Sequence, residues 1–209
     1  DVSAIGDVTI KSINSCKYTQ ARIKHLSLQI SIIKENANKS RSDKKDVSLA
    51  INAANKSYLD WAFLPAVERG LLLHNVVRAM IDNKNEIAKT VHLETGKSMK
   101  DALGETNGAI QCGLFFASEG QRLYGRTFQS GSPNKFVSSI REPVGLAGLI
   151  IAANTPIANV AWKVFPALIC GNAVILKAAE DTPATAWLFG KIAHEIGLPK
   201  GVLNIIPVS

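Results

Sequence analysis

The chain has 209 residues, of which 46% are hydrophobic and 20% are charged, the balance of an ordinary globular protein. Much of its net charge of +7 falls in residues 1–45, where nine Lys and Arg accompany four Asp and Glu without aromatic residues suited to stacking on bases. Every apolar stretch is broken well short of the roughly 20 residues that span a bilayer. We therefore expect neither a nucleic acid nor a membrane as a partner.

The cysteines and histidines argue against a disulfide framework and against a metal site. Cys16, Cys112 and Cys170 are widely spaced, odd in number and contain no C-x-x-C pair, and the four histidines lack metal-ligand spacing. We expect no bound metal and a reducing, cytoplasmic setting. Cys112 and Cys170 are predicted to be small apolar packing residues.

The first 43 residues predict little beyond a basic N-terminal arm, although "DVTIKSI" alternates as a strand does. From Asp46 the pattern becomes helical. Asp46 is predicted to be the N-cap of a helix over residues 47–63. The apolar face of that helix would consist of Val47, Ala50, Ala54, Tyr58 and Trp61.

A second helix is predicted over residues 66–83, with Pro65 fitting its first turn. Its apolar positions at helical spacing are Val67, Leu71, Val76 and Met80.

Two further helices follow. A third, near residues 85–95, should end at Gly96, because glycine readily adopts the left-handed conformation that terminates a helix. Ser98 and Asp101 form an S-x-x-D capping box for a fourth, long helix. That helix is predicted to reach about Tyr124, with Gly125 closing it.

After residue 125 the hydrophobic period changes. The stretch "NKFVSSIREPVG" alternates and carries a proline near its end, which predicts an extended strand or hairpin arm. From Gly145 onward, three short apolar runs alternate with two helical ones, the pattern of a parallel β-α-β-α-β layer. The strands are predicted at 145–151, 172–177 and 202–208, and the helices at 156–171 and 182–197.

The carboxyl ends of such parallel strands are where ligands bind. Here they carry Asn154, then Lys177 with Glu180, then Pro207 with Val208. The sequence therefore predicts an α/β fold in which N-terminal helices precede the first half of a Rossmann-like parallel sheet, with polar residues on its ligand-binding edge.

The stretch "REPVGLAGLIIAANTPIANVAWKVFPALICGNAVILKAAEDTPATA" resembles the cofactor-domain opening of the aldehyde dehydrogenase superfamily, the NAD(P)-dependent enzymes that oxidise aldehydes. Upstream, "PAVERGLLLHNVVRAMIDNKNEIAKTVHLETGKS" is similar to that family's N-terminal helices, and "EIGLPKGVLNIIP" to the segment entering its third cofactor-domain strand. The resemblance implies four parts: a poorly matched basic arm (1–43), the N-terminal helical part of the cofactor domain (44–125), an oligomerisation hairpin (126–143) and the first half of the NAD-binding domain (144–209).

The resemblance also implies roles for single residues. Asn154 matches the oxyanion-hole asparagine, whose NH₂ group donates to the oxygen of a thiohemiacetal. The residues alone favour a different interpretation, in which Asn154 is a turn residue before Pro156 and Thr155 caps the following helix. Lys163 is expected to be structural or peripheral.

The cofactor contacts are implied in the same way. Lys177 and Glu180, with Ala179 between them, match the residues that hold the adenosine ribose, and a carboxylate there favours NAD over NADP. The backbone of Ile150, Ile151, Ala152 and Ala153 should run beside the cofactor.

The sequence departs from the family's pattern at four positions. Ala152 and Ala153 stand where Pro-Trp is common, and Thr155 where an aromatic residue is common. These changes predict a wider or more polar substrate tunnel, or a site no longer under its usual constraint. Val208 stands where a glycine is usual and could crowd the cofactor.

No cysteine of the chain matches the family's nucleophile. The resemblance therefore predicts the N-terminal portion of an NAD-dependent aldehyde dehydrogenase, an enzyme that forms a cysteine thiohemiacetal. We expect this chain alone to be inactive. An aldehyde substrate and a homodimer or homotetramer are implied. Two alternatives remain: an acylating relative that passes the acyl group to a thiol cofactor, and a non-catalytic short homologue acting as an assembly or regulatory module.

Overall fold

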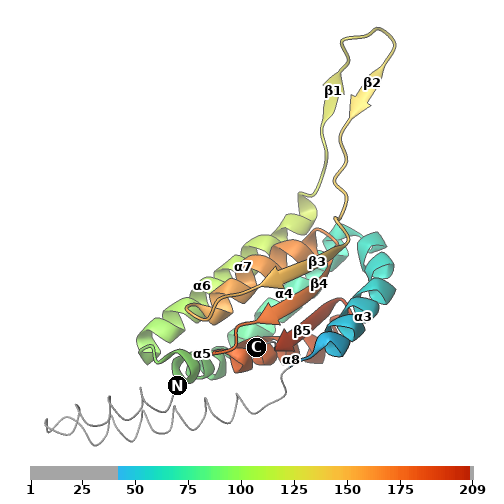
Figure 1. The fold of residues 1–209 in the computed structure, drawn as a ribbon. Helices are drawn as coiled ribbons and strands as arrows, with labels where there is room; N and C mark the ends of the chain where they lie inside the picture. The colour runs from blue at the N-terminus through green and yellow to red at the C-terminus, as the bar shows by residue number, and fades with distance from the viewer. Residues whose placement is uncertain (1–41, 208–209) are drawn as a thin grey trace, which may run out of the picture.

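A computed structural model describes residues 42–207 and places a layer of helices against a small parallel sheet, from which a long hairpin projects (Figure 1). The predictions for residues 1–41 and Val208 lie outside the described residues. The elements, in chain order, are α3 (Lys44–Phe63), α4 (Ala66–Asp82), α5 (Lys84–Thr95), α6 (Met99–Ser118), the 3₁₀ turn η1 (Glu119–Gln121), β1 (Thr127–Gln129), β2 (Phe136–Ser138), β3 (Leu146–Ile150), α7 (Pro156–Ile169), β4 (Ala173–Ala178), α8 (Pro183–Glu195) and β5 (Leu203–Pro207).

The sheet confirms the predicted β-α-β-α-β pattern. Its strand order is β3-β4-β5, and both neighbouring pairs are parallel. Helix α7 packs against β3 and β4, α8 packs against β5, and α3 lies across β4 and β5. The central strand is the most buried, as expected when both of its edges are paired. The predicted α/β class with a Rossmann-like parallel sheet is therefore confirmed.

The start of α3 corrects one prediction. Asp43, and not Asp46, is the N-cap: its Oδ1 accepts from the backbone N–H of Lys45 at 2.7 Å and of Asp46 at 3.1 Å. Asp46 Oδ2 accepts in return from the Asp43 N–H at 2.9 Å. Asp46 is thus the third helical residue of a capping box, and the helix begins three residues before the predicted start. The predicted inward face holds, since Ala50, Ala54 and Trp61 are buried.

The inward face of α4 is rotated from the predicted one. Val67 and Leu71 are 48% and 58% exposed, whereas Val76 and Met80 are fully buried. The buried apolar face consists of Leu73, Val76, Val77, Ala79 and Met80. Pro65 is the N-cap of α4, one residue before its first turn.

The fourth helix is shorter than predicted. Helix α6 ends at Ser118 and continues as η1. A Cβ on Gly120 would lie 2.4 Å from the Ala66 carbonyl oxygen, so this turn approaches the start of α4 too closely for any other residue. Gly125 does not close the helix. It lies at the base of the hairpin, where a Cβ would meet the Ser139 carbonyl oxygen at 1.6 Å.

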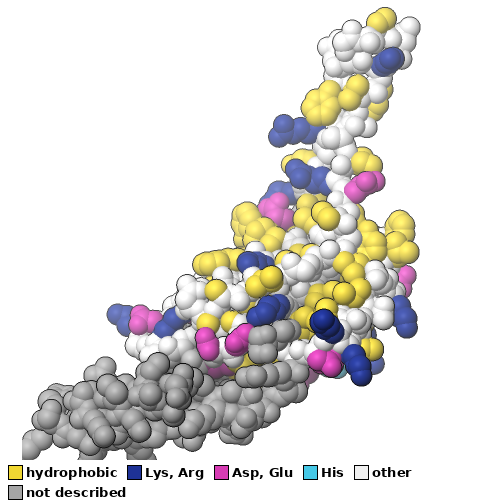
Figure 2. Space-filling view, viewed as in Figure 1, with side chains coloured by type: hydrophobic (Ala, Val, Ile, Leu, Met, Phe, Trp, Pro, Cys, Tyr) yellow, Lys and Arg dark blue, Asp and Glu magenta, His cyan; other side chains and the backbone are white. Residues whose placement is uncertain are grey.

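The hairpin, residues 126–143, forms an arm that extends away from the body of the molecule (Figure 1). Strands β1 and β2 pair antiparallel, with Phe128 opposite Val137. Hydrophobic side chains gather along the arm (Figure 2), among them Phe128 at 50% and Phe136 at 77% exposure. An isolated two-stranded hairpin is marginal in water, so an arm of this kind calls for a partner surface. Its predicted role in oligomerisation stays a prediction.

The N-terminal helices and the sheet layer share one hydrophobic core. Trp61 Nε1 donates to the Leu168 carbonyl at 3.0 Å, and Arg69 Nε donates to the Ile169 carbonyl at 3.1 Å. The Arg69 guanidinium also donates to the Ala62 carbonyl at 3.1 Å, at the end of α3. Burial lowers the pKa of Arg69 from its usual value. The corner between α3 and α4 is thereby fixed to the carboxyl end of α7.

The amino ends of α7 and α8 are capped by carboxylates from the N-terminal helices. Glu94 of α5 accepts from the Ala184 N–H at 2.7 Å, and from the N–H and hydroxyl of Thr185 at 2.8 and 2.6 Å. Glu105 of α6 accepts from the Ile157 N–H at 3.0 Å and the Ala158 N–H at 3.3 Å. These are the donors that a local N-cap side chain would otherwise satisfy.

The threonines at the two N-cap positions make no such bond. Neither Thr155 nor Thr182 caps its helix through its side chain. The alternative in which Thr155 caps the helix is therefore not confirmed, because a carboxylate from a distant helix accepts from the donors of its first turn. The Thr182 hydroxyl is buried and has no partner within residues 42–207.

Glu94 should make stability depend on pH. Burial raises the pKa of the Glu94 carboxyl, against the opposing effect of its hydrogen bonds from Thr185 and Ala184. The folded chain therefore binds the Glu94 carboxyl proton more tightly than the unfolded chain does. The contribution of Glu94 to the unfolding free energy falls as the pH rises from the pKa in the unfolded chain to the higher pKa in the folded chain. We expect the Tm difference between wild type and Glu94→Gln to shrink across that window and to be constant above it.

Thermal melts from pH 4 to pH 8 measure this difference, with Glu86→Gln on the exposed side of the same helix as the control. A difference that does not vary with pH would contradict the assignment.

Candidate functional site

The three strands of the sheet end together at one edge. Ile150 at the end of β3 pairs with Lys177 of β4, which in turn pairs with Ile206 of β5. The Ile151 N–H extends this pairing by donating to the Lys177 carbonyl at 3.3 Å. Residues that follow the three strands therefore meet at this carboxyl edge, where parallel sheets bind ligands.

Asn154 lies in the turn between β3 and α7, and its side chain is exposed. Its Oδ1 accepts from Asn159 Nδ2 at 3.4 Å. Its own NH₂ group donates to no other group in the described part of the chain. An uncommitted amide donor at the ligand-binding edge can bind an oxygen on which negative charge develops.

The backbone leading to Asn154 alternates between core and solvent. Ile151 is buried at 4% exposure, whereas Ile150 is 67% exposed. Ala152 is exposed and Ala153 is half-buried. Lys163 donates from Nζ to the Ile150 carbonyl, and so anchors the end of β3 from within α7, in keeping with the structural role expected for it.

The residues after β4 lie at the same edge. Lys177 is half-buried and donates from Nζ to the Ala178 carbonyl at 3.3 Å, while Ala179 is buried at 8% exposure. Glu180 is exposed, and within residues 42–207 its carboxylate forms no hydrogen bond or ion pair. Lys177 and Glu180 are therefore not paired with each other, and the Glu180 carboxylate is available to accept from a ligand.

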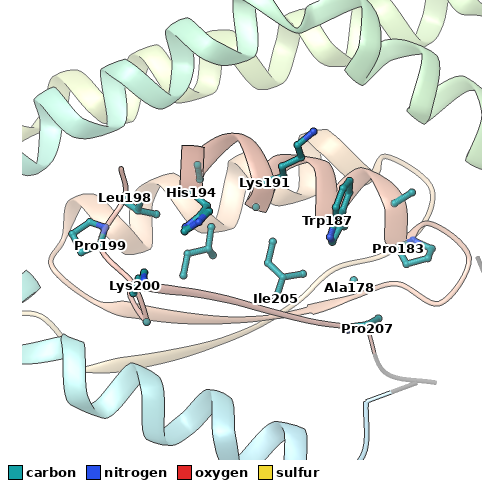
Figure 3. Close-up of a pocket in the computed structure, with 15 residues that line it drawn as sticks. Ala178, Pro183, Trp187, Lys191, His194, Leu198, Pro199, Lys200, Ile205 and Pro207 are labelled. Atoms are coloured by element: carbon teal, nitrogen blue, oxygen red, sulfur yellow. The ribbon is translucent and has the colours of Figure 1, made fainter. Parts of the chain in front are cut away.

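A groove of about 950 Å³ lies between α8 and β5 (Figure 3). Trp187, Lys191 and His194 line it from α8, and Ile205 lines it from the strand. At one end, Ala178 and Pro207 bring the groove to the carboxyl edge of the sheet. No pattern in the sequence predicted this groove.

The residues that line the groove from α8 share one side of that helix. Trp187, Lys191 and His194 are spaced at i, i+4 and i+7 on one side of the helix, and Trp187 is 62% exposed. A single exposed aromatic residue is common on protein surfaces, so this signal is too weak to predict a groove by itself.

The two described cysteines differ from each other. Cys112 is half-buried against the core, and burial raises the pKa of its thiol, which makes it a poor nucleophile. Cys170 is exposed, so its prediction as a packing residue was wrong: it is the C-cap of α7, where the chain leaves the core. Cys16 lies outside the described residues.

Residues 42–207 contain no group of three His, Cys, Asp or Glu side chains that could hold a metal ion. None of the described helices is both long enough and apolar enough to cross a membrane.

The geometry defines an α/β protein with uncommitted polar groups at the carboxyl edge of a parallel sheet, and comparison with known proteins identifies its family. The family model described as "Aldehyde dehydrogenase family" matches residues 33–209. The chain is 35% identical to a mitochondrial benzaldehyde dehydrogenase of Antirrhinum majus over 173 residues, which cover 81% of this chain and 32% of that protein.

Two solved structures are similar to the chain. An E. coli NADP dependent enzyme superposes with a TM-score of 0.79 and 32% identity, over 83% of this chain and 37% of that one. The structure of PnpE in complex with nicotinamide adenine dinucleotide gives a TM-score of 0.78 and 29% identity, over 81% and 35%. The chain belongs to the aldehyde dehydrogenase family, and it spans about a third of the length of the relatives it matches.

Glu105 should be the residue on which the junction before α7 depends most. Its side chain is 6% exposed, and it also pairs with Lys97. Glu105→Ala would leave two helix donors and a half-buried ammonium without their acceptor, which we expect to cost about 2–4 kcal/mol of unfolding free energy. Urea unfolding measures this cost. Glu119→Ala, which removes an exposed pair with Arg122, is the control and should change little. Equal losses in the two variants would contradict the capping role.

Proposed function

We propose that this chain supplies the oxyanion donor and the adenosine-ribose contacts of an NAD-dependent aldehyde dehydrogenase. In the reaction we propose, a cysteine thiolate attacks the aldehyde carbon to form a thiohemiacetal, and the acyl-enzyme is then hydrolysed to the carboxylic acid. Bound NAD would accept the hydride. The chain's own contribution is to orient the carbonyl and to hold the cofactor.

Asn154 carries this proposal. Its side chain is exposed at the carboxyl edge, and its NH₂ group is not used by other described residues. In the thiohemiacetal the former carbonyl oxygen gains negative charge, and a donor already fixed in place stabilises that charge without reorganising. The anchors around the turn support this role, because Lys163 holds the preceding strand and Glu105 the following helix.

Glu180 supports NAD as the cofactor. Its carboxylate is exposed and unpaired with any described residue, so it can accept from both hydroxyls of a ribose and would repel a 2′-phosphate. The backbone of residues 150–153 and Ala179 would line the approach to the cofactor, and Lys177 would turn its Nζ from the Ala178 carbonyl to the ribose. The groove along α8 adjoins this edge and would accept the adenine end.

The nucleophile must come from outside the described residues. Cys112 is half-buried in α6. Cys170 and Asn154 lie at opposite ends of α7, whose 14 residues span about 20 Å, far beyond bonding distance. Because the relatives are about three times as long, we propose that the cysteine and its base belong to a further part of the enzyme, and that the arm of residues 126–143 joins copies into an oligomer.

Replacing Asn154 tests the proposal. In the native polypeptide that carries these residues, Asn154→Ala should lower kcat for aldehyde-dependent NAD reduction by about 10²–10³-fold, because one oxyanion donor is lost. The affinity for NAD should be unchanged. Asn107→Ala, at an exposed position on α6, is the control. Wild-type turnover in Asn154→Ala would exclude the oxyanion role.

Glu180→Gln should weaken the preference for NAD. The ratio of kcat/KM for NAD to that for NADP should fall on the order of 10-fold or more, since charge-assisted hydrogen bonds to the ribose are lost and the repulsion of a 2′-phosphate is removed. Asp181→Asn, at the neighbouring exposed position, should leave the ratio near that of the wild type. If both variants shifted the ratio equally, the effect would belong to net charge and not to a ribose contact.

A further inference from the structure

The side chain of Asn159 holds the turn that carries Asn154. From the first turns of α7, its Nδ2 donates to Thr155 Oγ1 at 3.1 Å, to the Ala152 carbonyl at 3.2 Å and to Asn154 Oδ1 at 3.4 Å. All three acceptors belong to residues 152–155. One amide group therefore connects the end of the β3 segment, the Asn154 side chain and the residue before the helix.

The donor and acceptor roles in these hydrogen bonds determine the orientation of both side-chain amides, Asn159 and Asn154. A primary amide has an acceptor end and a donor end, and a backbone carbonyl can only accept. The Ala152 carbonyl therefore requires the NH₂ end of Asn159 on this side. With that end facing Asn154, the oxygen of Asn154 must face the helix, because the opposite orientation would bring two NH₂ groups together. The NH₂ of Asn154 is then left pointing away from α7.

We propose that Asn159 is a positioning residue that selects the orientation of the Asn154 amide in which the donor faces the ligand. This inference rests on the proposed role of Asn154 as the oxyanion donor. The terminal torsion of an asparagine has two broad wells that exchange its oxygen and nitrogen. Without Asn159 the amide would occupy both wells, and in one of them it would present an oxygen to the developing negative charge.

Two substitutions separate orientation from packing. Asn159→Asp keeps the size of the side chain but offers only acceptors. The Asn154 NH₂ should therefore rotate toward the carboxylate and donate to it, which leaves the Asn154 oxygen facing the ligand. A carboxylate this close to the start of α7 also suits the helix dipole, so the helix should not be weakened. Asn159→Leu keeps bulk without hydrogen bonding and leaves the Asn154 amide free to take either orientation.

The expected order of kcat is wild type, then Asn159→Leu, then Asn159→Asp. The leucine variant should lose less than about tenfold, the effect of one neutral hydrogen bond. The aspartate variant should approach Asn154→Ala, with a loss of about 10²–10³-fold. KM for NAD and the Tm should not follow this order. On the Asn154→Ala background, Asn159→Asp should have no further effect.

A measurement that does not depend on turnover completes the test. In NMR spectra of the chain, the side-chain NH₂ protons of Asn154 should exchange with water rapidly in the wild type and more slowly in Asn159→Asp. Equal exchange in both would overturn the inference, as would a fall in kcat as large in Asn159→Leu as in Asn159→Asp. If Asn154→Ala kept full activity, the proposed function would fail, while the exchange rates would still decide whether Asn159 orients the amide.

Discussion

The structure depends on one requirement: the first turns of a buried helix have N–H groups that need acceptors. In this chain the acceptors for both crossover helices come from the N-terminal helices. Glu105 serves α7 and Glu94 serves α8. The two bonding pairs are separated by 52 and 91 residues in sequence, so they join the N-terminal helices to the sheet layer in a defined register. The position of the turn before α7, and thus of Asn154, follows from the first of these contacts.

This long-range capping also explains which parts of the fold the sequence could predict. The order of strands and helices after Gly145 follows from apolar runs whose length and period are local properties. Two helix ends are local as well, since Gly96 ends α5 in the left-handed conformation and Ser98 caps α6, as predicted. The starts of α3 and α7 are not. Asp46 has the right chemistry for an N-cap, yet Asp43 holds that position because the two residues form a reciprocal box. Thr155 also has the right chemistry for an N-cap, but the Glu105 carboxylate already accepts from the N–H groups in the first turn of α7. Local pattern cannot reveal a competitor so distant in the chain.

Exposed apolar side chains are a second feature that the sequence could not predict. Val67 and Leu71 have helical spacing and are exposed, as are the aromatic side chains of the arm. A sequence pattern shows which residues are hydrophobic. It does not show which of them are buried within residues 42–207 and which are exposed there. The edge of the sheet at which the predicted site residues lie is easier to predict than the exposed surface, whereas their roles stay predictions. Ile150, Lys177 and Ile206 lie in register, so the segments that carry Asn154 and Glu180 leave the sheet at the same edge, as a parallel layer requires. The groove beside Trp187 was missed because it depends on the separation between α8 and β5.

The polar character of the turn gives a physical reason for its departure from the family's pattern. The resemblance implies an aromatic side chain at position 155, which would constrain its surroundings by packing. Thr155 has less volume, but its hydroxyl accepts from Asn159, which an aromatic ring could not do in the same way. A turn rich in small residues, Ala152 and Ala153 among them, supplies few contacts to limit side-chain rotation. Hydrogen bonds can supply that constraint instead, because their donors and acceptors are directional. In this chain the orientation of one amide thus depends on the polarity of its neighbours, whereas packing alone would not distinguish the oxygen of Asn154 from its nitrogen.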